Sequence, residues 1–374
     1  MVSDLVLVNG KIVTVDEKES VAQAVAVKFG KILAVGSNNK IEALTNKDTK
    51  VIDLKGRTVI PGLIESHCHP TGGALNHVIP AINASYEVGV RSIADIQSRI
   101  AERVKTTPKG EWINVSQEDD SKLVEKRHPN RWDLDEVAPE HPVMVTTVGG
   151  HFGIVNSKAL SIAGVTKDSP DPKVGDLTRV GTKLGRAGRY EKDPQTGEPT
   201  GWIYEGASQF IKPVSEAETA TVDQWMKGIK WMGEQFAAVG LTCAFDGGIR
   251  YPDCLIALQR LRNSGNLPIR MRLDVRYELM DHFLGLGIGS YQGFGDDMLK
   301  LNGLKITADG ACSGRTAWVA ESYLHRPGYY GDPAITREDL TKYVMKGYEK
   351  GYRFHCHSNG EQAINLFLDA LEEA

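Results

Sequence analysis

The sequence predicts an α/β fold: a TIM-type (β/α)₈ barrel with about five strands present, a small N-terminal β-sandwich unit, and a domain inserted after the first barrel strand. Three observations predict it: strand-like alternation near the amino terminus, a later alternation of strands with long helices, and a stretch of different character between the first two barrel strands. The predicted boundaries are 1–56 for the β-sandwich portion, 57–70 for the first barrel strand, 71–215 for the inserted α+β domain and 216–374 for barrel units 2–5.

The amino-terminal unit is predicted from short apolar-alternating segments between Leu5 and Leu54. Turn signals at Asn9-Gly10, Gly30 and Gly36 divide these segments, and such signals favour tight turns between antiparallel strands. We therefore expect a small antiparallel β unit, which contains no cluster of acid–base side chains.

The barrel is predicted from apolar strand candidates that alternate with segments whose apolar residues recur every three or four positions. Strands are expected at Val59 to His67, Leu241 to Asp246, Ile269 to Arg276, Gly303 to Ala308 and Tyr352 to His357. Helices are expected at Thr221 to Val239, Pro252 to Asn263, Arg337 to Glu349 and Gly360 to Leu371. A closed barrel needs about 250 residues and about 175 are available, so units 6–8 are expected to be absent from the sequence.

The inserted domain is expected to contain a helix near Ser92 to Lys105 and a strand near Pro142 to Val148. Its segment Lys167 to Thr200 is rich in Gly, Pro, Asp and Lys. That composition predicts an extended surface loop or a flap.

Composition and charge exclude several classes of partner. A formal net charge of -4 without basic clusters argues against nucleic acid and anionic membranes. The amino terminus lacks the regions of a signal peptide, and no apolar run approaches the roughly 20 residues of a membrane helix. The five cysteines show no C-x-x-C spacing, which indicates a reducing compartment. We expect a cytoplasmic protein with a small-molecule partner.

Two H-x-H pairs carry the strongest chemical signal, His67 with His69 and His355 with His357. Random placement of the histidines predicts roughly 0.3 such pairs. Residues two apart on a strand project to one face, so either pair can share a metal ion. An H-x-H pair alone is as often a polar surface pair, but the end of a strand is where barrel sites form.

Other candidates stand singly. Asp309, before Gly310, and Arg315 follow the fourth predicted strand and are expected to shape a substrate pocket; an Asp-Gly turn and a helix cap are the open alternative. His151 is isolated in the inserted domain, and Tyr204-Glu205 is expected to be structural. The remaining histidines have no partner motif and are expected at the surface: His77, His128, His141, His282 and His325.

The segment Val59-Ile-Pro-Gly-Leu-Ile-Glu-Ser-His-Cys-His69 resembles the first-strand motif of the amidohydrolase superfamily, P-G-x-I-D-x-H-x-H, with Glu65 in place of the usual Asp. Three later segments resemble its YtcJ-like subgroup, amidohydrolase family 3: Gly149 to Leu160, Gly303 to Gly310 and His357 to Ala363. In the last of them Glu361 again replaces an Asp. The motifs occur in the expected order across nearly the whole chain.

The resemblance implies a metal-dependent hydrolase of carbon–nitrogen bonds other than peptide bonds. It implies one or two divalent ions, zinc above all, held by His67, His69, His357 and a carboxylated Lys305, with a metal-activated hydroxide that attacks an amide-like carbonyl. An unmodified Lys305 that reaches solvent is the alternative. His151 is implied as a substrate-binding residue, together with Asp309 and Arg315.

The family's strand-six His and strand-eight Asp have no counterpart in the sequence, so the catalytic acid–base residue is unknown. Two alternatives therefore stay open. One is an incomplete barrel that acts as a non-catalytic metal-binding or interaction protein, and the other is a metal-dependent isomerase or decarboxylase on the same scaffold. A homodimer is a further expectation, and the substrate is not predicted.

Overall fold

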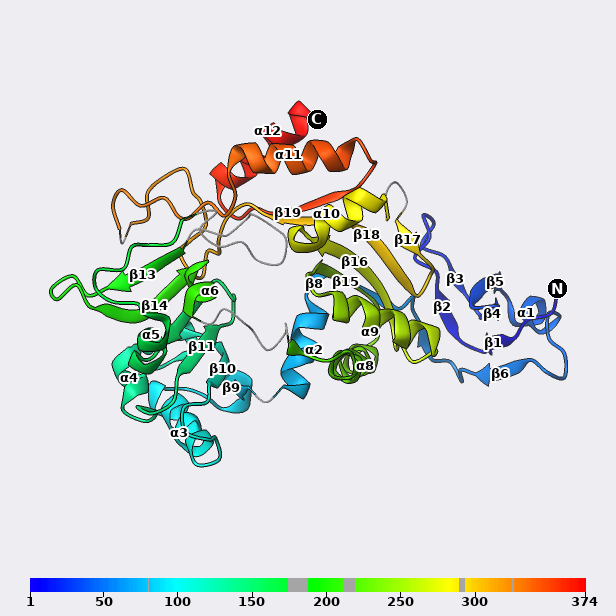
Figure 1. Ribbon diagram of the computed structural model, residues 1–374. Helices are drawn as coiled ribbons and strands as arrows, with labels where there is room; N and C mark the ends of the chain where they lie inside the picture. Colours follow the sequence, from blue (N-terminus) through cyan, green and yellow to red (C-terminus); the bar gives the residue numbers. More distant parts are fainter. Residues whose placement is uncertain (80, 174–187, 212–218, 289–292, 325) are drawn as a thin grey trace. The chain divides into compact units, whose positions relative to one another are not determined.

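The computed structural model of the chain describes residues 1–79, 81–173, 188–211, 219–288, 293–324 and 326–374. They form two compact units, one made of Met1–Ile64 with Gly240–Cys243 and the other of Glu65–Val239 with Ala244–Ala374. Figure 1 shows the course of the chain through both. Within the described residues, no helix is long and apolar enough to cross a membrane.

The first unit contains two small sheets and one short helix. Its elements are β1 (Leu5–Val8), β2 (Lys11–Val13), β3 (Val21–Ala22), β4 (Ala24–Lys28), β5 (Lys31–Gly36), α1 (Asn38–Glu42), β6 (Lys50–Asp53) and β7 (Thr58–Val59). One sheet has the order β5-β4-β1-β6 and the other β3-β2-β7. Ile12, Val25 and Leu54 form an apolar cluster shared by both sheets, and Ile41 of α1 packs in a second cluster with residues of β1 and β4.

The prediction of a small antiparallel amino-terminal unit holds only in part. β1 pairs antiparallel with β4 but parallel with β6, and β2 pairs parallel with β7. A parallel pair needs a long connection, and the chain between β1 and β6 provides one.

The parallel strands of the second unit lie in sequence order. The sheet contains β8 (Leu63–Cys68), β15 (Leu241–Ile249), β16 (Arg270–Arg276), β17 (Phe294–Gly295), β18 (Leu299–Thr307) and β19 (Phe354–His357). Its order is β8-β15-β16-β18-β19, with the short β17 antiparallel to β18. In the described part of the chain β8 and β19 do not pair with each other. The predicted α/β class is confirmed, while a TIM-type barrel with about five strands present stays a prediction.

The predicted first barrel strand is divided into β7 and β8. Val59 pairs with Ile12 in the first unit, whereas β8 joins the parallel sheet. Pro61 lies between the two strands and has no backbone N–H to donate to a ladder, which explains the interruption.

Helices follow most of these strands and share one apolar core with them. They are α8 (Val222–Ala238), α9 (Pro252–Asn263), α10 (Tyr277–Leu286), α11 (Arg337–Tyr348) and α12 (Glu361–Glu373). Thr221 caps α8 in a capping box with Gln224, close to the predicted start. Helix α10 was not predicted, because it follows β16 directly and Arg276 supplies no side-chain cap.

The inserted segment forms a six-stranded sheet of order β13-β14-β12-β11-β10-β9. Its strands are β9 (Ile82–Asn83), β10 (Ile113–Glu118), β11 (Val143–Thr147), β12 (Phe152–Val155), β13 (Gly188–Lys192) and β14 (Pro199–Glu205). The helices of this segment are α2 (Pro70–Val78), α3 (Ile93–Val104), α4 (Arg131–Asp135), α5 (Ser157–Ala163) and α6 (Ala207–Ile211), with 3₁₀ helices at Tyr86–Val88 and Asp120–Lys122. Ala74 and Leu75 of α2 are buried in the apolar core of the parallel sheet instead. The predicted helix and strand correspond to α3 and β11.

The prediction of a surface loop over Lys167 to Thr200 is wrong where β13 and β14 pair antiparallel. Tyr190 and Ile203, which face each other across this pair, are buried at 6% and 1% exposure. Burial of these two side chains outweighs the loop-like composition of their neighbours. Residues 174–187 of the same segment lie outside the described residues.

Candidate active site

The first H-x-H pair lies at the carboxyl end of β8. His67 belongs to the strand and His69 precedes α2. Their ring centroids are 5.7 Å apart with ring planes at 81°. Between them, the Cys68 thiol donates to the Phe245 carbonyl at 3.3 Å. The strand therefore presents both imidazoles side by side.

Both rings of this pair are held in the neutral form at pH 7. Burial lowers the pKa of His67, and burial followed by the Lys305 charge lowers the pKa of His69 to about 4. Both side chains nevertheless keep contact with solvent. Neutral imidazole is the form that binds metal ions, so the pair is chemically ready for one.

Lys305 lies on β18 and is 3% exposed. Burial lowers the pKa of its amine, and the nearby Arg276 lowers it further. Asp274 on β16 is fully buried; its Oδ2 pairs with His355 Nδ1, while its Oδ1 has no partner within the described residues. This contact spans β18, where Asp274 lies opposite Gly303 and His355 lies opposite Lys305. A buried amine and a half-satisfied carboxylate thus lie close to the first histidine pair.

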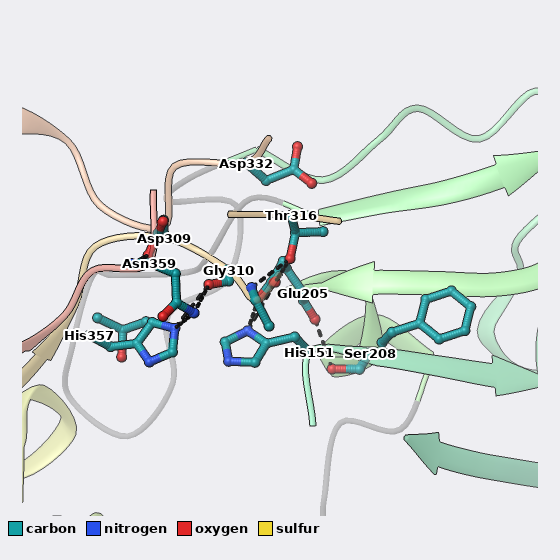
Figure 2. A network of polar contacts seen from close by, with 12 residues as sticks. His151, Glu205, Ser208, Asp309, Gly310, Thr316, Asp332, His357 and Asn359 are labelled. Atoms are coloured by element: carbon teal, nitrogen blue, oxygen red, sulfur yellow. Dashed lines mark hydrogen bonds and ion pairs between the residues drawn. The ribbon is translucent and has the colours of Figure 1, made fainter. Parts of the chain in front are cut away.

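His357 ends β19 and is fixed by the loop that follows β18. Its Nε2 lies 2.9 Å from the Gly310 carbonyl oxygen and 3.0 Å from Asn359 Nδ2 (Figure 2). Asn359 Nδ2 also donates to Gly310 O at 2.9 Å. When His357 Nε2 donates to Gly310 O, the lone pair of the ring is on Nδ1. Burial lowers the pKa of this ring as well.

His151 lies at the start of β12 and stacks on His357, with ring centroids 5.1 Å apart and 24° between the planes. Its Nδ1 donates to the carboxylate of Glu205, whose oxygens lie 3.0 and 2.9 Å away. Thr316 Oγ1 donates to the same carboxylate at 2.7 Å. Figure 2 shows this chain of contacts from the inserted sheet to the end of β19.

Asp309 is fully buried, and its carboxylate accepts hydrogen bonds from backbone N–H groups. Its Oδ2 accepts from the N–H groups of Trp318 (2.9 Å) and Gly360 (2.7 Å), and its Oδ1 from Asn359 (2.9 Å). Asp309 therefore fixes the backbone at the start of α12. Arg315 is exposed on the same loop with φ 54, and its role in substrate binding stays a prediction.

The predicted metal ligands are brought together only in part. His67 and His69 adjoin, and Lys305 is near enough to lower the pKa of both. His357 has His151 as its ring neighbour. Across the described ranges, no three His, Cys, Asp or Glu side chains are placed to share an ion. Two neutral imidazoles and an adjacent buried amine are the groups that the structure offers to a divalent ion at this place.

Sequence reasoning missed several members of this network. Glu205 was expected to be structural, yet its carboxylate joins His151 to Thr316. Asn359 could have been singled out from the sequence, because it lies only two residues after His357. Of the histidines expected at the surface, His141 is 5% exposed and His128 pairs with Glu118, so that expectation is wrong for both, while His325 lies outside the described residues. The sequence did not predict these contacts, because burial depends on residues that are distant in the chain.

Comparison with known families gives one clear match. The model of the amidohydrolase family covers residues 50–374, most of the chain. A putative amidohydrolase, YtcJ of Bacillus subtilis, is 28% identical over 98% of this chain and 65% of its own length. The N-substituted formamide deformylase of Arthrobacter pascens is 25% identical over 99% of this chain and 66% of its own length.

Two further proteins are similar to this chain. Protein LONG AFTER FAR-RED 3 of Arabidopsis thaliana is 26% identical over the whole chain and 61% of its own length. The crystal structure of an uncharacterized metal-dependent hydrolase from Pyrococcus horikoshii superposes with a TM-score of 0.70 at 22% identity, over 99% of this chain and 68% of that one. The chain thus spans about two thirds of the length of these proteins.

Proposed function

The chain belongs to the amidohydrolase family, and we propose that it acts as a metal-dependent hydrolase on amide-like carbon–nitrogen bonds of a small molecule. The observation that carries the proposal is the His67 and His69 pair, whose two imidazoles lie 5.7 Å apart and have lowered pKa values. The names of two relatives, a putative amidohydrolase and an N-substituted formamide deformylase, support this class of reaction.

His67 and His69 would hold one divalent ion through neutral ring nitrogens, and imidazole donors suit zinc. A bound divalent ion polarises a carbonyl and acidifies water, which brings hydroxide within reach near neutral pH. In the tautomer whose Nε2 donates to Gly310 O, His357 would offer its Nδ1 lone pair as a further metal ligand. A TIM-type barrel with about five strands present and a cytoplasmic homodimer remain proposals that rest on the sequence.

Lys305 is proposed to be carboxylated. Its neutral amine nitrogen would attack the carbon of carbon dioxide and lose a proton, which leaves a carbamate with an anionic oxygen ligand. Lowering of the Lys305 pKa by burial supports this step, because only the neutral amine is nucleophilic. The carbamate would also replace a buried cation with a group that a divalent ion neutralises.

The substrate side of the site is assigned to the network beyond the metal ligands. His151 would contact the substrate through its second ring nitrogen, and Arg315 from the exposed loop. Asp309 would act through the loop and helix that it holds, because its oxygens are occupied by three backbone N–H groups.

The test uses the full-length protein from its natural coding sequence, reconstituted with zinc, manganese or iron. A panel of N-substituted formamides, N-acyl amino acids and cyclic imides is assayed by release of amine or acid. We expect metal-dependent turnover of at least one class, lost in His67→Ala and kept in His77→Ala, an exposed histidine that stacks on Trp231. Carbon-13 NMR with labelled bicarbonate checks the carbamate on Lys305.

A non-catalytic metal-binding role is the second candidate. It is favoured by the lack, among the described residues, of a third His, Cys, Asp or Glu ligand beside His67 and His69. Metal bound in stoichiometric amount, without turnover of any amide class by the full-length protein, would establish this role and reject hydrolysis.

A further inference from the structure

A buried carboxylate determines which nitrogen of His151 carries the proton. The Glu205 side chain is 2% exposed, and His151 Nδ1 lies 3.0 and 2.9 Å from its two oxygens. An ionised carboxylate only accepts hydrogen bonds, so His151 Nδ1 is the donor. In the neutral ring the lone pair is therefore on Nε2, which has no protein partner within the described residues.

Glu205 is itself held from two elements that are far apart in the sequence. Its backbone has φ 47, in the left-handed region that non-glycine residues rarely adopt, and its N–H donates to His151 O at 2.9 Å. Thr316 Oγ1 donates to its side chain at 2.7 Å. A Cβ at Gly310 would lie 2.4 Å from Glu205 Oε1, so only glycine lets the loop pass this carboxylate. A costly backbone conformation is kept where the surrounding contacts impose it.

The free edge of His151 is turned toward the candidate site. Its ring stacks on His357 at 5.1 Å, and its side chain is 15% exposed. In Figure 2 the second nitrogens of both rings point to the same side, away from the polar network. A substrate that binds next to His357 Nδ1 therefore also comes within reach of His151 Nε2.

We propose that Glu205 is a positioning residue that keeps the Nε2 lone pair of His151 toward the site, where this nitrogen accepts a hydrogen bond from an N–H group of the substrate. The proposal rests on the proposed function in that the substrate is an amide. It has a consequence for specificity: amides with an N–H are preferred over amides whose nitrogen carries two carbon substituents. One such hydrogen bond corresponds to about a fivefold to tenfold difference in affinity.

The positioning role is tested by nitrogen-15 NMR of histidine-labelled protein at pH 8, where an ordinary imidazole is neutral. The signal of His151 is assigned by its loss in His151→Gln. Wild type is expected to show the proton on Nδ1. In Glu205→Gln the Thr316 hydroxyl keeps the new amide oxygen on its side, so the amide N–H faces His151 Nδ1 and moves the ring proton to Nε2.

Glu118→Gln is the matched control. Glu118 is also a fully buried carboxylate that accepts from a histidine ring, His128 Nδ1 at 2.8 Å, but it has no hydrogen bond to His151, Thr316 or His357 among the described residues. This variant is expected to leave the His151 signals as in wild type. A wild-type His151 with its proton on Nε2 would overturn the positioning role.

The recognition step is tested with N-benzylformamide and N-benzyl-N-methylformamide, added to each labelled protein while the His151 signals are followed. Wild type and Glu118→Gln are expected to bind the first amide about fivefold to tenfold more tightly, and Glu205→Gln to lose this preference. Equal affinities in wild type, or no shift of His151 with either amide, would overturn the recognition step. Since the readout needs no turnover, these shifts in a protein without hydrolase activity would reject the proposed function alone.

Discussion

The imidazole of His151 stacks on that of His357, with centroids 5.1 Å apart and planes 24° apart. The first ring comes from the inserted sheet and the second from the end of β19. Each is bonded through one nitrogen, His151 to Glu205 and His357 to Gly310, which leaves one nitrogen of each ring for a ligand. The pair is thus a two-point polar site whose hydrogen-bonding pattern is imposed by its neighbours.

Removal of either imidazole of the first pair should weaken metal binding. His67→Ala or His69→Ala is expected to raise the dissociation constant for zinc by about tenfold or more, because two adjacent neutral nitrogens bind an ion together. Equilibrium dialysis with metal analysis measures this. His77→Ala, at an exposed ring stacked on Trp231, should bind zinc like wild type; unchanged zinc in all three variants would contradict the assignment.

The metal-free protein should lose stability in acid through His69. Its pKa falls from 6.5 to about 4 in the folded chain, so the unfolded chain binds the proton first as the pH drops. Stability is therefore unaffected well above pH 6.5 and decreases from there toward pH 4. Urea denaturation of wild type and His69→Gln across this window measures the effect, and the variant should show the shallower decrease. A midpoint near 6.5 for this ring in an NMR titration would refute the prediction.

Lys305 should be unfavourable for stability in the metal-free chain. Replacing its buried amine in Lys305→Met is expected to leave the free energy of unfolding unchanged or raise it by about 1 kcal/mol, since a buried charge is removed and the volume kept. Leu304→Ala, at the neighbouring fully buried position, should cost about 2–5 kcal/mol. Thermal and urea denaturation compare them, and a loss above about 2 kcal/mol in Lys305→Met would show that the amine stabilises the fold.

Gly310→Ala should disrupt the link between the inserted sheet and the loop after β18. The added Cβ would lie 2.0 Å from Thr316 Oγ1 and 2.4 Å from Glu205 Oε1, so the loop must move. We expect a loss of about 1–3 kcal/mol and altered NMR signals of His151. The control is Gly285→Ala in α10, where nothing lies within 4 Å and the helix should gain about 0.5–1 kcal/mol. Equal stability of the two variants would count against this tight packing.

Asp309→Asn should weaken the start of α12. An amide nitrogen would meet backbone N–H donors where the carboxylate now accepts from Trp318, Asn359 and Gly360, so we expect a loss of about 1–3 kcal/mol. Hydrogen exchange of the Gly360 amide reports the local effect. Asp253→Asn, at an exposed position in the first turn of α9, should lose less than about 1 kcal/mol, and a similar loss in both variants would speak against a special role for Asp309.

The local sequence pattern was enough to predict most strands of the parallel sheet and most of the helices that follow them. Apolar periodicity predicted α8, α9, α11 and α12 within a few residues, because this signal depends on near neighbours in the chain. The same reasoning failed at β13, where loop-like residues pair because Tyr190 becomes buried. It also missed the parallel pairs of the first unit, since strand direction depends on where distant segments return.

By itself the sequence determined the α/β class, the H-x-H pair at the end of β8 and the motifs of the amidohydrolase family, all of which are local in the chain. Only the tertiary structure decided that Glu205 accepts from His151, that Asp309 is occupied by backbone donors, and that Asp274 of β16 pairs with His355 of β19. These relationships join residues far apart in the sequence, and they depend on burial, which removes water as the competing partner of each polar group.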